Sequence, residues 1–366
     1  MTPRRLLFDL GHPAHVHLFH PVIQQMVERG HICLVTARAK DVTTRLLDHY
    51  GHRYHLLAPL GRRLSGQLRE LIQREWNLYR LAHREGIDLI VGTSVNAARV
   101  ARYLAIESVI VNEDDAAAVP TWKWLGYPFA TRIVTPDCLR YEQWGKRHIT
   151  YRGNQELFYL HPNRFQADAS VRKKLGLHPT EKYGVVRLSA LQAHHDLLAR
   201  GITDQLLTDI VDLCEGTCRV LITSERPLPA RWEPRRMPAP PEDVLHVLAM
   251  ATFVVGDSQT MIAEAAVLGR PAFRLSSFVG KLAYLHELEQ AQLAFGFLPG
   301  AEHQLVEQLK RILQDPLYQA ENLRRRERWL ASKIDPLPWF CDLLETGFDT
   351  QRPERGNPTD RAEFLR

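Results

Sequence analysis

The sequence has few cysteines, and their spacing is not that of a metal-binding motif. Five cysteines occur among 366 residues, without a Cys-x-x-Cys pair. Cys214 and Cys218 lie four positions apart, but no histidines follow at zinc-finger spacing. We therefore expect reduced, mostly buried thiols rather than a disulfide framework or a structural zinc site.

Long apolar runs are also missing. No stretch reaches the roughly 18 residues that a bilayer-spanning helix needs. The N-terminus reads Met-Thr-Pro-Arg-Arg and enters a strand pattern without the apolar segment of a signal peptide. We therefore expect a cytoplasmic protein.

Long basic runs are absent too, which argues against nucleic acid as a partner. The net charge is only +5, a modest excess that favours phosphate-bearing ligands or an anionic membrane surface. Arg62, Arg63 and Arg69 flank a loop, and four arginines near the C-terminus follow a helical pattern. These four form either a solvated helix face or a patch for the inner face of the membrane; they are Arg324, Arg325, Arg326 and Arg328.

What the sequence does have is a regular alternation of strands and helices. That order predicts parallel sheets covered by helices on both faces, and the length suggests two such domains. The predicted strands span residues 5–9, 31–36, 88–91, 108–112 and 131–135, and then 183–188, 219–223, 253–255 and 272–275. The predicted helices span residues 15–29, 41–50 and 65–84, and then 203–214, 242–250 and 261–268.

Ligands of such folds bind beyond the carboxyl ends of strands, and the turn after residue 255 is the best candidate. Gly256 and Asp257 lead into a helix whose free N–H groups attract a diphosphate. Glu264 lies about 9 Å further along that helix, a separation that suits ribose hydroxyls. The alternative is an ordinary capped helix with a solvated glutamate. Side-chain donors at the mouth of the helix are Ser258, Gln259 and Thr260.

Three strand ends in the first half carry further candidates. A histidine near its usual pKa can accept the proton of a hydroxyl, so His12 or His15 after Gly11 is a candidate base. Glu113 and Asp114 offer carboxylates for the same task or for binding an acceptor, unless they are solvated loop acids. Thr93 and Ser94 form either a ligand-facing turn or a simple helix cap. We expect no metal at these positions.

Three segments together resemble a known group of proteins. "GDSQTMIAEAAVLGRPAF", residues 256–273, resembles the donor-nucleotide segment of glycosyltransferase-B proteins. Residues 8–38, "FDLGHPAHVHLFHPVIQQMVERGHICLVTAR", resemble the start of the N-acetylglucosaminyltransferase that makes lipid II. With "YRGNQELFYLHPNRF", residues 151–165, they resemble a bacterial and archaeal family known as a domain of unknown function. The resemblance covers about residues 4 to 315.

The resemblance implies the glycosyltransferase-B fold, an α/β architecture with two Rossmann-like domains facing a cleft. It implies an acceptor-side domain over 1–155, a nucleotide-sugar-binding domain over 156–334, and a helix over 335–350 that crosses back to the first domain. That helix is otherwise a local cap on the second domain. Residues 351–366 are expected to form a flexible tail.

The resemblance also implies roles for individual residues. Glu264 would hold the ribose, and Ser258, Gln259 and Thr260 would face the diphosphate. The loop after the first strand of the second domain lacks the expected glycines, so side chains would supply the charge there, unless its histidines simply begin a surface helix. Gly153, Asn154 and Glu156 would lie at the hinge between the domains. The loop residues concerned are Arg187, Ser189, His194 and His195.

These roles predict an inverting, metal-independent glycosyltransferase that uses a nucleotide-diphosphate sugar as substrate and no cofactor. Its acceptor would be a saccharide or a lipid-linked saccharide in surface polysaccharide or glycolipid synthesis, with peripheral association at the inner membrane. A non-hydrolysing UDP-sugar 2-epimerase and a non-catalytic nucleotide-sugar-binding protein remain alternatives. Against the epimerase, Gln259 and Thr260 replace the Gly-Gly that follows Asp-Ser in those enzymes.

Overall fold

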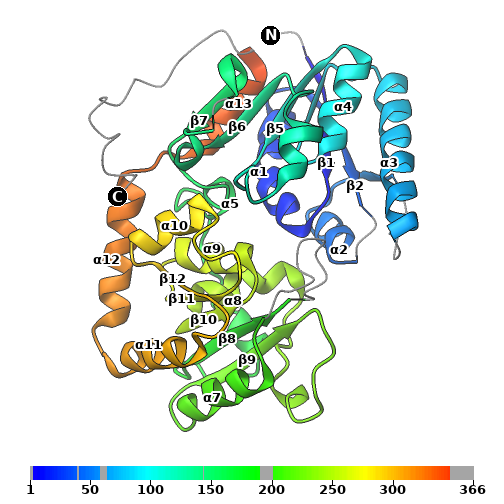
Figure 1. Cartoon of the computed structure of the whole chain (residues 1–366). Helices are drawn as coiled ribbons and strands as arrows, with labels where there is room; N and C mark the ends of the chain where they lie inside the picture. Colours follow the sequence, from blue (N-terminus) through cyan, green and yellow to red (C-terminus); the bar gives the residue numbers. More distant parts are fainter. Residues whose placement is uncertain (1–2, 39–40, 58–63, 143, 190–200, 347–366) are drawn as a thin grey trace.

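The protein is built on two parallel β-sheets, each covered by helices on both faces (Figure 1). The computed structural model describes residues 3–38, 41–57, 64–142, 144–189 and 201–346. We call the seven-stranded sheet with its helices the first lobe, and the five-stranded sheet with its helices the second lobe.

The first lobe has the strand order β3-β2-β1-β4-β5-β6-β7. Leu6, Leu7 and Phe8 in the central strand are all fully buried, because a strand covered on both faces is apolar at successive positions. The strands are β1 (Arg5–Leu10), β2 (Ile32–Ala37), β3 (Tyr54–Leu56), β4 (Leu89–Gly92), β5 (Glu107–Val111), β6 (Arg132–Pro136) and β7 (His148–Tyr151).

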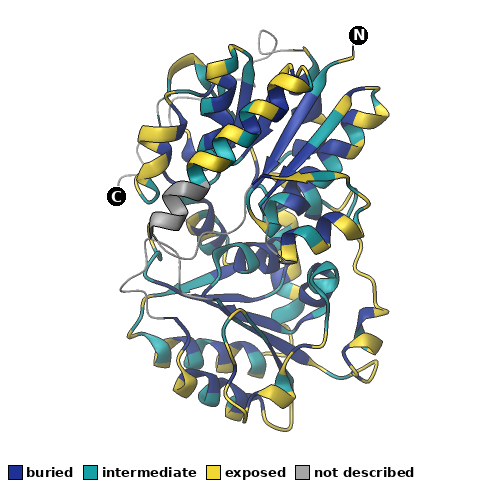
Figure 2. Cartoon of the chain, turned by 90° about the vertical axis from the view of Figure 1, so that its right-hand side faces the viewer, coloured by how far each residue is buried: buried dark blue, intermediate teal, exposed yellow. Residues whose placement is uncertain are grey.

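Two helical layers cover this sheet. One apolar cluster joins α1 and α2 to one face, and a second joins α3, α4 and η1 to the other. Figure 2 views the molecule from the side that carries α3 and shows buried strands behind exposed helix surfaces. The helices are α1 (Pro13–Glu28), α2 (Asp41–His49), α3 (Leu64–Arg84), α4 (Val95–Leu104) and the π-helical η1 (Trp122–Gly126).

The second lobe has the strand order β12-β11-β10-β8-β9. Helices α8, α9 and α10 pack on one face, and α7 and α11 on the other. The strands are β8 (Tyr183–Leu188), β9 (Arg219–Ser224), β10 (Phe253–Gly256), β11 (Ala272–Leu275) and β12 (Ala294–Phe297). The helices are α7 (Asp204–Cys214), α8 (Val244–Met250), α9 (Gln259–Val267), α10 (Ala283–Gln290), α11 (Glu302–Gln314) and α12 (Tyr318–Ala331).

The chain connects the lobes at two adjacent places. After β7 it passes through α5 (Leu157–Leu160) and α6 (Val171–Lys174), and it returns after α12 into α13 (Pro336–Thr346). The backbone N–H of Ile334 donates to the carbonyl of Arg152, at 2.9 Å, so the two passages touch. Helix α13 packs on α1, with Phe340 fully buried among core residues of the first lobe.

Most predicted strands and helices are present; three strands and the helices α10 and α11 were missed, and the starts of α1, α8 and α9 each differ from the prediction by two residues. The missed strands β3, β7 and β12 are short, and each is an edge strand of its sheet, where apolar patterning is weak. Helix α1 begins at Pro13 rather than at the predicted His15. His12 is extended and accepts from the N–H of Ala14, and proline suits the first helical position.

Candidate functional site

The turn between β10 and α9 is hydrogen-bonded to the end of the neighbouring strand β8. Ser258 caps α9 by accepting from the N–H of Met261 at 3.5 Å. Oδ1 of Asp257 accepts from both the N–H and the hydroxyl of Ser189, each at 2.7 Å. Ser189 directly follows β8, so the turn fixes the ends of β8 and β10 against each other. Gln259 and Thr260 lie partly exposed on the first turn of α9.

Glu264, on the same helix, is buried rather than solvated. Glu264 is only 5% exposed, and its Oε1 accepts a hydrogen bond from the hydroxyl of Tyr159 at 3.0 Å. Burial raises the pKa of Glu264 to about 7, although the hydrogen bond from Tyr159 and the charge of Arg187 oppose that rise. Tyr159 lies in α5, so this carboxylate faces the connection between the lobes.

Two arginines flank Gly256 across the sheet. Gly256 pairs with Arg187 of β8 and with Arg274 of β11 in the same register, so all three lie on the face that α9 covers. A Cβ on Gly256 would lie 3.1 Å from the Cβ of Arg187, so a side chain there would crowd the arginine. The row places two guanidinium groups beside the helix that carries Glu264.

The two arginines are only partly satisfied. Arg274 is 1% exposed and donates from Nη2 to Glu289 at 2.9 Å, while its Nε and Nη1 have no partner among the described residues. Arg187 pairs with Glu225 and Thr223, and its Nε likewise lacks a partner in the described part of the chain. Buried donors without partners are rare in proteins, so both arginines have spare capacity for an anion.

Carboxylates of the first lobe and of the connection lie close enough to Glu264 to interact with its charge. Burial raises the pKa of Glu113 well above its usual range, and the neighbouring Glu156 and Asp114 raise it further. Burial and the charge of Asp115 raise the pKa of Asp114 to about 6. Burial raises the pKa of Glu156 to about 8, with the charges of Glu264 and Asp114 acting in the same direction. Carboxyls from both lobes and the connection therefore lie within electrostatic range of one another.

Polar atoms in this region lack partners. Within the described residues, no hydrogen bond is made by Oε2 of Glu113, Oε2 of Glu156, the hydroxyl of Tyr151 or either amide atom of Asn154. Asn154 is fully buried and Glu156 is 1% exposed. Carboxylate, amide and phenol groups together can both accept from and donate to sugar hydroxyls. We call Glu113, Tyr151, Asn154 and Glu156 the connection cluster.

Gly153 lies inside the same segment and is closely packed. A Cβ at this position would come within 3.2 Å of the Tyr151 ring. Glu156 directly precedes α5. The segment therefore forms the first passage between the lobes and also carries three of the four residues of the connection cluster, all except Glu113.

The histidine turn of the first lobe is held by short-range hydrogen bonds. Nδ1 of His15 accepts from the N–H of Gly11 at 3.2 Å and contacts Oγ1 of Thr93 at 2.6 Å. Nδ1 of His12 accepts from Ala14. The rings of His12 and His15 are 5.7 Å apart. An imidazole whose Nδ1 accepts from an N–H carries its proton on Nε2 when neutral.

Asp9, which the sequence analysis did not select, is the central acid of this turn. It is fully buried and accepts from Thr36 at 2.9 Å, from Arg74 at 2.8 and 2.9 Å, and from Ser94. Ser94 also caps α4 by accepting from Ala97 at 3.1 Å. Thr93 and Ser94 thus act as turn and cap residues of the fold.

Some predicted positions cannot be placed. His194 and His195 lie outside the described residues, as do Arg62, Arg63 and the predicted tail over 351–366. Among the residues that the structure describes, no group of three or more His, Cys, Asp or Glu side chains has the geometry of a metal site. No helix in the described ranges is both long and apolar enough to cross a membrane.

Three side chains of the site were missed from the sequence: Tyr151, Tyr159 and Arg274. One signal was available for Arg274, which stands at the end of a predicted strand as Arg187 does. Tyr159 lies inside a segment selected for its resemblance, but no pattern showed that its side chain would contact Glu264.

The chain belongs to the family described as "Protein of unknown function (DUF354)", whose model matches residues 5–287. No curated protein matches the chain. The solved structures that it resembles have the glycosyltransferase-B fold, and this is the fold of the present protein.

Three of these structures illustrate the likeness. A putative UDP-N-acetylglucosamine 2-epimerase from Listeria monocytogenes is 12% identical, with TM-score 0.67 and coverage of 97% of this chain and 99% of that chain. The spinosyn forosaminyltransferase SpnP is 17% identical, with TM-score 0.63 and coverage of 94% and 100%. S. aureus MnaA, solved with UDP, is 12% identical, with TM-score 0.64 and coverage of 91% and 92%. At such identities the likeness shows the fold alone.

Proposed function

We propose that this protein is a glycosyltransferase that moves a sugar from a nucleotide diphosphate to an acceptor hydroxyl. The observation that carries the proposal is Glu264, a buried carboxylate on the helix that follows the β10 turn and faces the carboxyls of the first lobe. Within this proposal the chain divides functionally into an acceptor-side part over 1–155 and a donor-binding part over 156–334.

The donor would bind at the β10–α9 turn. Glu264 would accept from the two ribose hydroxyls, and the diphosphate would lie at the N-terminus of α9. Helix N-termini bind anions through free N–H groups and the helix dipole. Arg187 and Arg274 would oppose the charge that develops on the leaving diphosphate, which is the main electrostatic demand of the reaction.

The sugar or the acceptor would contact the connection cluster. Its unpartnered atoms include both acceptors and donors, as a hydroxyl-rich ring requires. A saccharide bound there would satisfy groups that otherwise remain buried without a partner. Surface polysaccharide or glycolipid precursors are acceptors of this chemistry, because they offer ring hydroxyls in number.

We assign the general base to Glu113 in preference to His12 and His15. In both histidines Nδ1 already accepts from a backbone N–H, so the neutral ring presents a proton rather than a lone pair at Nε2. Glu113, a member of the connection cluster, has a carboxylate oxygen without a partner among the described residues. Its raised pKa means that the base becomes available as the pH rises, and its basicity then suits proton abstraction.

A thermal-shift screen tests the donor site. Wild type, Glu264→Ala and the control Glu327→Ala, an exposed residue of α12, are each mixed with UDP- and TDP-sugars. We expect stabilisation of wild type and the control by one nucleotide class and its loss in Glu264→Ala. Affinity should fall about 10-fold or more, since hydrogen bonds to a charged group contribute roughly 1.5–3 kcal/mol. Equal stabilisation of all three proteins would refute the donor site.

A UDP-sugar 2-epimerase is the second candidate. The observation that favours it is the pair of buried carboxyls, Glu156 and Glu264, whose pKa values of about 8 and 7 suit an acid and a base at neutral pH. Product analysis after incubation with UDP-N-acetylglucosamine alone separates the two: an epimerised sugar without any acceptor favours this candidate. Binding without turnover under every acceptor condition would favour a non-catalytic nucleotide-sugar-binding protein.

A further inference from the structure

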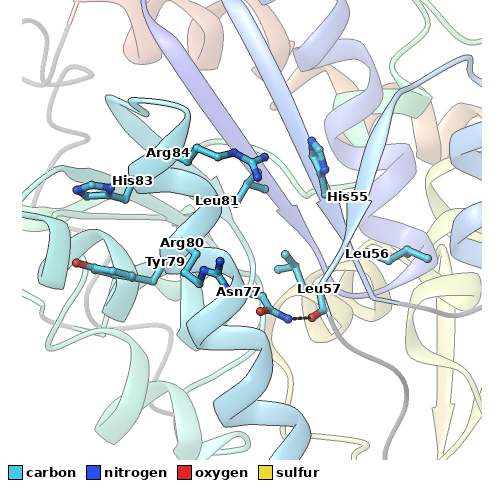
Figure 3. A pocket seen from close by; sticks show the side chains of 9 residues that line it. All are labelled: His55, Leu56, Leu57, Asn77, Tyr79, Arg80, Leu81, His83 and Arg84. Carbon is cyan, nitrogen blue, oxygen red and sulfur yellow. Dashed lines mark hydrogen bonds between the residues drawn. The ribbon is translucent and has the colours of Figure 1, made fainter.

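A basic cavity lies away from the site described above, between α3 and the edge strand β3. Its volume is about 520 Å³. Figure 3 shows the guanidinium of Arg84 and the ring of His55 directed toward one another from the two elements. No carboxylate is among the residues that line it; those that matter here are His55, Leu56, Leu57, Asn77, Arg80 and Arg84.

Large apolar side chains are exposed beside this cavity. On the outward side of α3, Ile72 is 62% exposed and Trp76 is 58% exposed, and Leu56 on β3 is 53% exposed. Ile72, Trp76, Arg80 and Arg84 follow one another at intervals of four residues, so each lies next to the following one in a stripe that winds about 120° around the helix. Apolar residues at solvent-facing positions of a helix are unusual and mark an interaction surface when they cluster.

The arginines of this stripe have little internal compensation. Arg80 is exposed and makes no ion pair with any described residue. Arg84 is 68% exposed and pairs only with the adjacent Glu85 within the described ranges. The cationic charge of the cavity is therefore available to an external anion. We call Leu56, Ile72, Trp76, Arg80 and Arg84 the α3 face.

Helix α12 is also rich in arginine but has few exposed apolar side chains. On α12, three arginines share the single carboxylate Glu321, and Arg326 donates to the carbonyl of Val267 at 2.6 Å. No large apolar stripe accompanies them: of this helix, only Leu323 is among the exposed large hydrophobic residues of the described chain, at 37%. The two helices thus offer an internal comparison between a basic surface with large exposed apolar side chains and a basic surface with few of them.

We propose that the α3 face docks on an anionic phospholipid membrane, with a lipid phosphate in the cavity. Tryptophan is favoured at the membrane–water interface, where its ring is partly immersed. Basic residues close to the surface add attraction to anionic lipids. Arg80 and Arg84 line the cavity, and Trp76 stacks on Tyr79, which also lines it. One lipid headgroup can therefore contact the arginines while Trp76 and Ile72 enter the interface. This inference does not depend on the proposed reaction.

Sedimentation with vesicles tests the proposal. The full-length protein is mixed with vesicles of phosphatidylglycerol and phosphatidylcholine, and with vesicles of phosphatidylcholine alone. We expect binding to the anionic vesicles only. Arg80→Glu/Arg84→Glu should weaken it by about 10-fold or more, whereas the matched reversal Arg324→Glu/Arg328→Glu on α12 should change it less than about twofold. Equal loss in both double variants, or no binding by wild type, would overturn the proposal.

Trp76 provides a second measurement that does not rely on charge. Anionic vesicles should shift the tryptophan emission of wild type to shorter wavelength, and Trp76→Phe should lose most of that shift while its circular dichroism is unchanged. A competing reading is a contact between two copies of this chain. Sedimentation velocity decides it: a dimer that Arg80→Glu/Arg84→Glu dissociates would overturn membrane docking. Nucleotide-induced stabilisation of the same variants should remain, so failure here leaves the donor site untouched.

Discussion

Two buried acidic sites of this protein differ in whether their polar atoms have partners. At Asp9 both carboxylate oxygens accept hydrogen bonds, from Thr36, Arg74 and Ser94. In the connection cluster, one oxygen of Glu113, one of Glu156 and the whole amide of Asn154 have none among the described residues. Both sites follow strand ends of the first lobe or its connection. Only at Asp9 do both oxygens of the carboxylate have partners, although Nε of the pairing Arg74 has none among the described residues.

We infer from the difference that Asp9 holds the fold and that the connection cluster binds a ligand. A buried carboxylate opposite an arginine stabilises its surroundings only if every group is paired. Unpaired buried groups cost stability, and proteins retain them where a ligand completes the set. Asp9 would therefore be structural and the connection cluster functional, although both stand at positions where this fold binds substrates.

The largest expected effect is on catalysis. Glu113→Gln should lower turnover by about 10²–10⁴-fold, because a general base contributes that much. Its thermal stability should remain equal to wild type or rise, because the substitution removes a buried ionisable group. Turnover is measured as nucleoside diphosphate released with acceptor present. A variant that keeps the wild-type rate would remove Glu113 from the mechanism.

Asp9→Asn should instead lower the stability of the folded protein. Removing the charge leaves Arg74 without its counter-ion in a buried site, which costs roughly 3–5 kcal/mol of the free energy of unfolding. Urea denaturation measures this loss, with Asp48→Asn, an exposed acid of α2, as the control. If Asp9→Asn were as stable as wild type but failed to bind nucleotide, the division between structural and functional acids would be wrong.

The smallest expected effect is on the pH dependence of stability. Glu156 and Glu264 have raised pKa values of about 8 and 7, so the folded state binds more protons than the unfolded state. The stability they contribute is complete below about pH 4.5 and is lost as the pH rises through 7 and 8. Each carboxyl can account for up to about 1.4 kcal/mol per pH unit.

Histidines act in the other direction but at lower pH. Burial lowers the pKa of His17 and of His20 from 6.5 to about 4, so their contribution is present above pH 6.5 and is lost as the pH falls toward 4. The window from pH 6.5 to about 8.5 therefore reports the carboxyls. Melting temperatures there should fall for wild type and for Glu327→Gln, and fall less for Glu156→Gln. Parallel curves for all three would show that the carboxyls do not titrate in that range.

The sequence was sufficient for the general plan of the fold. Apolar strands followed by small polar residues and helices predicted the parallel sheets, and the spacing from Ser258 to Glu264 placed a carboxylate on α9. The short strands β3, β7 and β12 escaped because a few residues near a sheet edge carry little periodicity.

The missed parts of the site depend on which elements become neighbours. Arg187, Gly256 and Arg274 form a row only because β10 lies between β8 and β11, an order that differs from the order along the chain. The burial of Glu264 depends on Tyr159 from the connection between the lobes. Local patterns describe a helix and its cap, but not which distant segment covers it.

The two passages of the chain between the lobes lie side by side at Arg152 and Ile334 and so form one hinge region. Two tethers fastened side by side permit rotation about the line through them and resist sliding or twisting. Rotation about this line would have to break the pair between Arg45 of α2 and Glu242 of the second lobe, and the hydrogen bond from the N–H of Ala283 to Asp115. Groups near the two passages, including Glu156, would move least. Phe340 belongs to α13, which follows the second lobe in the chain, yet it packs in the core of the first lobe. A fragment that ends at residue 155 would therefore expose an apolar groove. We expect it to need residues 336–346 in order to fold.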